Sequence, residues 1–127
     1  MTENNLRRIC DAAKEASKVA YAQYSGLKVG AAVETEKGIF TGSNVENASY
    51  GLTICAERVA IASAVAGGAR KVKKVAVYSR QKLLAPCGAC LQVIREFASP
   101  DADIIICTDK KMKKMKLGRL LPLPFRL

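Results

Sequence analysis

Two short cysteine segments constrain this chain most, because each stands at the beginning of a predicted apolar helix. The first, Thr53–Arg58, reads Thr-Ile-Cys-Ala-Glu-Arg and leads into a stretch rich in Ala, Val and Ile. The second, Pro86–Cys90, reads Pro-Cys-Gly-Ala-Cys, and a proline is typical of a helix amino end. A strand-like run, Lys73–Ser79, separates the two. The sequence therefore predicts two buried helices whose amino ends carry thiols.

The remaining elements follow from hydrophobic periodicity and turn residues. In chain order, we expect a helix at Leu6–Ala22, strands at Lys28–Glu36 and Ile39–Gly42, a helix at Ile54–Ala66, a strand at Lys73–Ser79, a helix at Cys87–Phe97 and a strand at Asp103–Cys107. The tail Leu117–Leu127 contains too much proline to be helical throughout. A hairpin followed by alternating helices and strands predicts an α/β fold with a mixed sheet covered by helices.

The chain is long enough for one domain with a core of its own. It has 127 residues, 50% of them hydrophobic, so we expect a single domain over residues 1–127. No apolar run reaches the roughly 20 residues that a membrane-spanning helix needs. The amino-terminal residues are polar and lead into no apolar signal region. We therefore expect a cytoplasmic protein with no membrane partner.

Histidine is absent, and cysteine occurs five times. Without histidine, the chain has no Ser-His or Cys-His nucleophile pair and no His-ligated metal. An odd number of cysteines without a signal peptide argues against a disulfide framework. Cys10, on the first helix, and Cys107, at the end of a strand, are expected to be core residues.

The formal net charge is +10, and much of it lies in two lysine-rich stretches, Arg70–Lys74 and Lys110–Lys116. Such a surplus can serve nucleic-acid binding. The chain, however, has only four Tyr and three Phe, and neither stretch contains an aromatic residue on which bases could stack. We interpret the lysines as a solvated face. RNA or an acidic partner remains the alternative.

Cys55, Cys87 and Cys90 form the constellation that can carry chemistry. The pair Cys87 and Cys90 has C-x-x-C spacing at a helix start, where the helix dipole favours the thiolates that a metal needs. With Cys55 as a third ligand, one position of a tetrahedral zinc ion stays open, which is typical of catalytic sites. Glu57 can face that position as a proton carrier, and Arg58 can offset the thiolate charge. A redox C-x-x-C pair is the competing interpretation, and it leaves Cys55 unexplained.

The order Cys-Ala-Glu, 28 residues, then Pro-Cys-x-x-Cys resembles the signature of zinc-dependent deaminases. More narrowly, the chain resembles the small homotetrameric cytidine deaminases. The matching stretches are Tyr24–Ser25, Val29–Ala32, Gly42–Gly51, Ile54–Arg58, Pro86–Cys90 and Leu120–Pro122. The resemblance implies a three-layer domain with a five-stranded sheet, whose fifth strand would lie just before Leu117.

The resemblance also implies an activity. Zinc-bound hydroxide, with one Zn²⁺ per chain, would attack the base of cytidine or deoxycytidine, releasing ammonia in pyrimidine salvage. Cys55, Cys87 and Cys90 would bind the zinc ion, and Glu57 would shuttle protons.

The substrate contacts and the assembly are implied in the same way. Asn44 and Glu46 would bind the ribose 3′-hydroxyl, the backbone around Ala56 would contact the base edge, and Leu27 would pack on the base. Arg58 and Gln92 would contact the residues that bind zinc and substrate without touching the substrate themselves. Ala48, Tyr50 and Phe125 would reach the pocket of a neighbouring subunit in a homotetramer. The partner would be a nucleoside, and nucleic acid is not expected.

Two residues depart from the family pattern. Leu27 stands where the family usually has Phe, which removes an aromatic contribution of about 0.5–1.5 kcal/mol from stacking on the base. Leu91 stands where the family commonly has Arg. A deaminase for a modified nucleoside such as blasticidin S shares the zinc core and is an alternative, although the stretch Asn44–Asn47 favours plain nucleosides. The net charge of +10 leaves a polynucleotide-editing deaminase as another alternative, which would need room for flanking nucleotides. A structural zinc module or a basic nucleic-acid-binding protein is the alternative outside enzymes.

Overall fold

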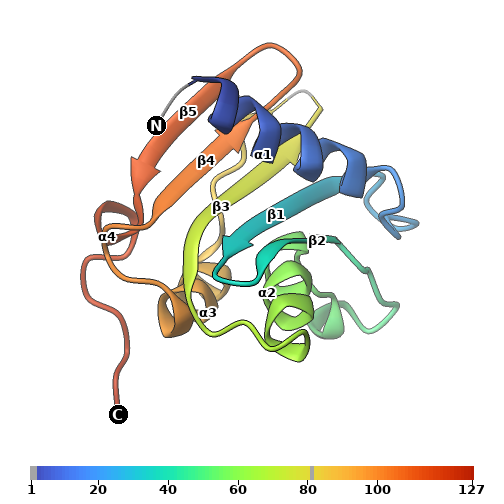
Figure 1. The fold of residues 1–127 in the computed structure, drawn as a ribbon. Coiled ribbons are helices and arrows are strands. Elements are labelled where there is room, and N and C mark those ends of the chain that lie inside the picture. Colours follow the sequence, from blue (N-terminus) through green and yellow to red (C-terminus); the bar gives the residue numbers. More distant parts are fainter. Residues whose placement is uncertain (1–2, 81) are drawn as a thin grey trace.

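The computed structural model describes residues 3–80 and 82–127, and a five-stranded sheet forms its centre (Figure 1). The strand order is β2-β1-β3-β4-β5. The strands are β1 (Val29–Thr35), β2 (Gly38–Ser43), β3 (Val72–Ser79), β4 (Asp103–Cys107) and β5 (Met112–Lys116). Only the central pair β3 and β4 runs parallel; the other three neighbouring pairs are antiparallel. The sheet is therefore mixed, as the sequence predicts.

Helices cover both faces of this sheet (Figure 1). The helices are α1 (Glu3–Ser17), α2 (Ala56–Ala66), α3 (Gly88–Phe97) and the short α4 (Leu117–Leu120), together with the 3₁₀ turn η1 (Tyr50–Leu52). α1 packs on one face over a cluster that includes Ile9, Ala76 and Ile105. α2 and α3 pack on the opposite face over a larger cluster that includes Ile61 and Ile94. The expected three-layer α/β domain is confirmed.

Two glycines allow helices to approach the sheet closely. A side-chain carbon at Gly30 would lie 1.8 Å from the carbonyl oxygen of Ala13 on α1. One at Gly42 would lie 2.4 Å from the backbone nitrogen of Ala60 on α2. No side chain tolerates such distances, so each glycine sets how closely one helix layer packs on the sheet.

The end of the first helix differs from the sequence-based expectation, whereas the fifth strand agrees with the family resemblance. The first helix ends at Ser17, not Ala22, because residues 18–20 form tighter turns with i→i−3 hydrogen bonds. The backbone of Tyr21 then bonds to Asn44, so tertiary pairing replaces the helix there. The fifth strand lies directly before Leu117, where the family resemblance places it.

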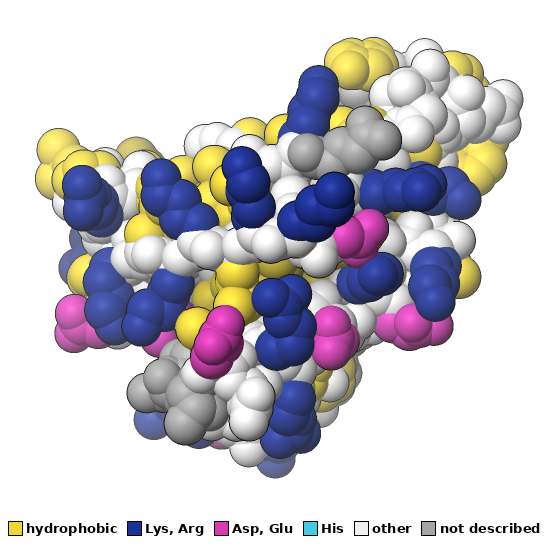
Figure 2. Space-filling model, turned by 90° about the horizontal axis from the view of Figure 1, so that it is seen from above, with side chains coloured by type: hydrophobic (Ala, Val, Ile, Leu, Met, Phe, Trp, Pro, Cys, Tyr) yellow, Lys and Arg dark blue, Asp and Glu magenta, His cyan; other side chains and the backbone are white. Residues whose placement is uncertain are grey.

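The lysine-rich stretch at residues 110–116 leads into and forms the edge strand β5. Met112 packs against the cluster under α1, and Met115 packs against the cluster on the other face. Lys113 and Lys114 between them are exposed. Lysines on an edge strand oppose edge-to-edge pairing with other chains. Figure 2 shows Lys and Arg side chains spread across the face seen from above, with fewer acidic side chains among them.

Cys10 and Cys107 are both buried, as expected, and they form a disulfide between α1 and β4. The odd cysteine count argued against disulfides, and this pair corrects that expectation. The two residues are 97 positions apart in the sequence, and only the packing of α1 on the sheet brings them together.

Among the described residues, no helix combines the length and the apolar character needed to cross a membrane.

Candidate active site

Three thiols meet where two helices begin. Cys55 is the N-cap residue of α2 and Cys87 is the N-cap residue of α3, and neither side chain is used as a cap. Cys90 lies in the first turn of α3 and is fully buried. The three sulfur atoms lie within 4.8 Å of one another, and those of Cys87 and Cys90 are 3.6 Å apart. Zinc–sulfur bonds of about 2.3 Å place two ligands of a tetrahedral ion roughly 3.8 Å apart, so the cluster suits one zinc ion.

The two thiols of α3 differ in acidity. Burial alone would raise the pKa of Cys87, but the backbone N–H groups of Cys90 and Ala89 and the Cys90 thiol stabilise its thiolate, so its pKa is lowered. Burial, followed by the negative charge of Glu57, raises the pKa of Cys90 well above its usual range. A cation between the sulfurs would offset both effects on Cys90, because it favours the thiolate.

Arg58 supplies a positive charge beside the thiols. Its Nη2 atom donates to the Cys55 sulfur over 3.5 Å. Hydrogen bonds to Cys55 and Cys90 raise the pKa of Arg58 further, so it stays charged. Its Nε atom is the one buried side-chain nitrogen or oxygen without a hydrogen-bond partner among the described residues. Because the guanidinium lies against the sulfur cluster, its positive charge compensates part of the negative charge of the thiolates.

Glu57 is the acidic group of the site. Its side chain is on the first turn of α2 and is 5% exposed. Burial is the largest influence and raises the pKa of Glu57 above its ordinary value, although its own backbone N–H and Arg58 act in the opposite direction. A buried carboxyl group with a raised pKa beside a candidate metal centre is suited to proton transfer.

A cavity of about 280 Å³ opens beside the cluster. The residues that line it include Cys55, Cys87, Glu57 and Ala56. The predicted substrate-binding residues Leu27, Asn44, Glu46 and Tyr50 line it as well. The fold therefore brings together side chains from the loop before β1, the loop after β2, η1, and the beginnings of α2 and α3. This volume is close to the lower end of the range typical of small-molecule sites.

Asn44 and Glu46 also hold the wall of the cavity. The Asn44 side chain accepts a hydrogen bond from the N–H of Val29 (2.8 Å) and donates one to the carbonyl of Leu27 (2.9 Å). Glu46 accepts from the N–H groups of Tyr24 (2.9 Å) and Ser25 (3.0 Å), and from the Ser25 hydroxyl.

These bonds affect both the acidity and the shape of the site. Led by those from Ser25, they lower the pKa of Glu46. These backbone contacts were not predicted from the sequence, although a buried Asn in a loop is typical of such backbone bridging.

Of the three residues predicted to reach a neighbouring subunit, Ala48 and Phe125 lie away from the cavity of their own chain. Ala48 is exposed in the loop after β2. Phe125 lies in the tail, where the side chain of Gln92 hydrogen-bonds to its backbone over 3.0 and 3.1 Å. Tyr50, by contrast, lines the cavity of its own chain. Leu91, one of the two departures from the family pattern, is 7% exposed and belongs to the core under α2 and α3.

The fold and this site define a class of protein: a three-layer α/β domain with a three-cysteine cluster suited to one zinc ion and a buried carboxyl group beside a small-molecule cavity. A sequence model of the cytidine and deoxycytidylate deaminase zinc-binding region matches residues 3–108. The chain belongs to this family.

Individual relatives agree with the family assignment. The probable cytidine deaminase of Dictyostelium discoideum is 41% identical over 125 residues, covering 96% of this chain and 84% of the relative. The crystal structure of cytidine deaminase from Burkholderia pseudomallei superposes with a TM-score of 0.89 at 43% identity, covering 98% of this chain and 100% of that chain. The blasticidin-S deaminase of Bacillus cereus is less similar, with 32% identity over 107 residues, or 76% of each chain.

Proposed function

We propose that the protein removes the amino group of cytidine and deoxycytidine by hydrolysis, giving uridine or deoxyuridine and ammonia. The observation that carries the proposal is the joint placement of three thiols and the buried Glu57 on one small cavity. We place the reaction in pyrimidine salvage in the cytoplasm, with a free nucleoside as the substrate.

Glu57 moves the protons of this reaction. Cys55, Cys87 and Cys90 would hold a zinc ion, which would act there as a Lewis acid and make water nucleophilic at neutral pH. Glu57 accepts a proton as water adds to C4 of the base and delivers it to N3. It then transfers the second proton of that water to the departing amino group, so that ammonia leaves as the C4 carbonyl forms. Because Glu57 is nearly free of solvent contact, these protons stay within the site.

The cavity walls supply recognition. Asn44 retains one N–H and Glu46 retains acceptor positions beyond their backbone contacts, and we assign these to the ribose 3′-hydroxyl. The backbone around Ala56, which is fully buried at the start of α2, contacts the base edge. Leu27, 41% exposed at the mouth, packs on the base. A site built to hydrogen-bond a hydroxyl strongly disfavours an analogue that lacks it.

We further propose a homotetramer in which neighbours complete each site through Ala48, Tyr50 and Phe125. The large apolar side chains Tyr50 (78% exposed) and Phe125 (71%) support an assembly, because a single chain leaves them in solvent. Phe125 does not line the cavity that contains its own chain's Glu57. Its ring is therefore available to another subunit.

The deciding experiment measures loss of cytidine absorbance by the purified protein and by Glu57→Gln, together with zinc content. We expect turnover of cytidine and deoxycytidine with about one zinc per chain. Glu57→Gln should keep the zinc and lose at least about 10³-fold in kcat, because the proton carrier is removed. Zinc-loaded protein that leaves both nucleosides unchanged would contradict the proposal.

A modified nucleoside is the second candidate substrate. The observation in its favour is Leu27, an aliphatic residue in the cavity lining at a position where the family usually has Phe. Blasticidin S in the same assay separates the two candidates. A higher kcat/KM for blasticidin S than for cytidine would favour the second.

A further inference from the structure

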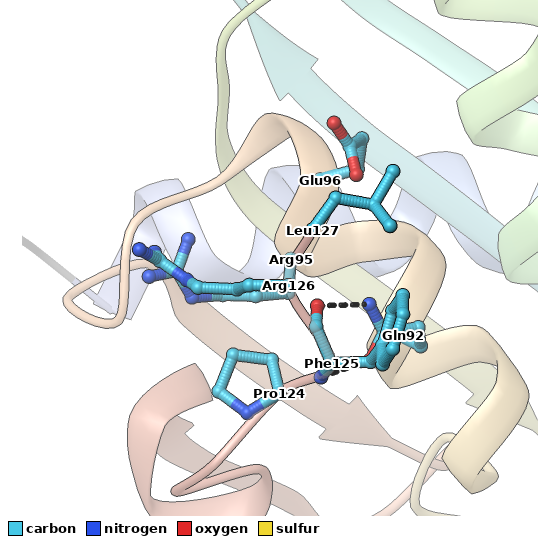
Figure 3. Close-up of a pocket in the computed structure, with 7 residues that line it drawn as sticks. All are labelled: Gln92, Arg95, Glu96, Pro124, Phe125, Arg126 and Leu127. Carbon is cyan, nitrogen blue, oxygen red and sulfur yellow. Dashed lines mark hydrogen bonds between the residues drawn. The ribbon is translucent and has the colours of Figure 1, made fainter.

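The carboxy-terminal tail is attached to the domain through one side chain. After α4, residues 122–127 make only two hydrogen bonds to the rest of the described chain. Both join the backbone of Phe125 to the side chain of Gln92 on α3. The Phe125 N–H donates to Oε1 of Gln92 (3.0 Å), and Nε2 of Gln92 donates to the Phe125 carbonyl (3.1 Å). Figure 3 shows Gln92 facing the Phe125 backbone.

Packing does little to hold the same segment. Leu123 is 88% exposed and Phe125 is 71% exposed. A hollow of about 420 Å³ lies between the tail and the outer side of α3, bordered by Gln92, Arg95, Glu96 and residues 124–127 (Figure 3). The position of Phe125 therefore depends on the two amide contacts more than on apolar contacts.

Two bonds to one residue fix more than its position. Because a primary amide pairs with the N–H and the C=O of the same residue, it also sets the orientation of that peptide segment, and hence the direction of the ring. Pro122 and Pro124 restrict the backbone on the amino-terminal side of Phe125. A stiff tail with one amide anchor presents its ring in a defined direction at a small entropic cost on binding.

We propose that Gln92 is a positioning residue: it clamps the tail so that the Phe125 ring is held out, preorganised, for a neighbouring subunit's substrate cavity. The proposal rests on the proposed function, in which Phe125 serves a neighbour. It also links two sites through one helix, because Gln92 follows the candidate zinc ligand Cys90 by two residues on α3. Gln92 does not itself touch the nucleoside.

The test compares Gln92→Met, which keeps the length of the side chain and removes both hydrogen bonds, with Glu96→Met. Glu96 lies one turn further along α3 and borders the same hollow, but makes no hydrogen bond to the tail. The first measurement is hydrogen exchange of the Phe125 amide, which needs no substrate. We expect Gln92→Met to abolish its protection and Glu96→Met to leave it unchanged. Equal protection in both variants would overturn the clamp, whatever the enzyme's activity.

The second measurement is steady-state kinetics on cytidine for Gln92→Met, Phe125→Ala and the double variant. We expect each single change to raise KM about tenfold with a smaller effect on kcat, because a binding contact is lost rather than the proton carrier. The double variant should be no worse than Phe125→Ala, since the clamp acts only through the ring.

Zinc content and thermal stability of Gln92→Met should match Glu96→Met. The proposal would be overturned if KM of the double variant rose by the product of the two single effects. A raised KM for Phe125→Ala beside an unchanged KM for Gln92→Met would overturn it as well. A wild-type protein inactive on cytidine would instead count against the proposed function alone.

Discussion

At the scale of single residues, the polar side chains of the site work on the protein as well as on a substrate. Asn44 bridges residues 27 and 29, and Glu46 holds residues 24 and 25, so the wall of the cavity depends on both. Arg58 is similarly committed to the Cys55 sulfur. Replacing any of these therefore changes the shape of the site along with its chemistry.

Asp109 gives a pH-dependent prediction at this scale. It pairs with Lys14 over 2.8 Å and accepts a hydrogen bond from the Tyr78 hydroxyl over 2.7 Å. Lys14 first, and then Tyr78, lower the pKa of Asp109 from 3.8. A carboxylate whose pKa is lowered by folding stabilises the fold above its unfolded pKa, and this contribution disappears as the pH falls through the folded value.

We therefore expect Asp109→Asn to lower the urea midpoint at pH 7. The midpoints of variant and wild type should converge below about pH 4. Urea titrations of both proteins from pH 7 to pH 2 measure this. A difference that stays constant over the whole range would show that the charge of Asp109 is not responsible.

At the scale of elements, the layers are joined by close contacts that local sequence preference does not specify. Gly30 on β1 faces the backbone of α1, and Gly42 on β2 faces the backbone of α2. A disulfide joins α1 to β4. The helix that is remote from the candidate active site is thus attached to the sheet by both packing and a covalent bond.

Gly30→Ala should separate α1 from the sheet, because the new carbon would overlap the carbonyl oxygen of Ala13. Overpacking of this kind costs about 3 kcal/mol, which lowers Tm by about 10 °C in a domain of this size. Gly51→Ala is the matched control, since a carbon there meets no atom within 4 Å. Equal Tm values for the two variants would contradict this account of the packing.

The Cys10–Cys107 disulfide should contribute about 2–4 kcal/mol to stability, because it closes a long loop of the unfolded chain. We expect a non-thiol reductant to lower the urea midpoint of the wild type and to leave the double variant Cys10→Ala/Cys107→Ala unchanged. Thiol counting after unfolding and metal removal gives an independent check. Five reactive thiols in unreduced protein, rather than three, would exclude the disulfide.

At the scale of the whole molecule, the proposed tetramer distributes one active site over several chains. Glu57 and the thiols belong to one subunit, while the proposal takes Phe125 from another. The exposed apolar tail and the exposed Tyr50 fit such an arrangement better than they fit a single chain in solvent.

Mixed assemblies test this division of labour. Glu57→Gln subunits keep the tail, and Phe125→Ala subunits keep the proton carrier. Equal amounts of the two variants are unfolded and refolded together. If all chains assemble at random, about a quarter of the sites should regain both Glu57 from one chain and Phe125 from its neighbour. Refolding each variant alone is the control. If the mixture is no more active than the weighted sum of the two, Phe125 serves its own chain or none.

Local signals explain how much of this molecule was predictable. Alanine-rich periodicity and Pro86 predict the helix starts at which Cys55 and Cys87 lie, so these candidate ligands follow from short stretches of sequence. The apolar run of β4 is likewise a local signal. The end of α1 at Ser17 was missed because the backbone of residue 21 pairs with Asn44, a partner outside any sequence window. The resemblance to the deaminases, rather than periodicity, predicted β5, whose lysines obscure the strand pattern.

The sequence alone determined the chemistry that this protein can carry out: without histidine, zinc must be held by cysteine or carboxylate side chains, and helix amino ends favour the thiolates. The tertiary structure alone decided which groups meet. The third thiol, the Cys10–Cys107 bond and the Gln92 contact with Phe125 all join residues far apart in the chain. Such contacts depend on how helices pack against the sheet, and packing is a property of the whole fold rather than of any segment.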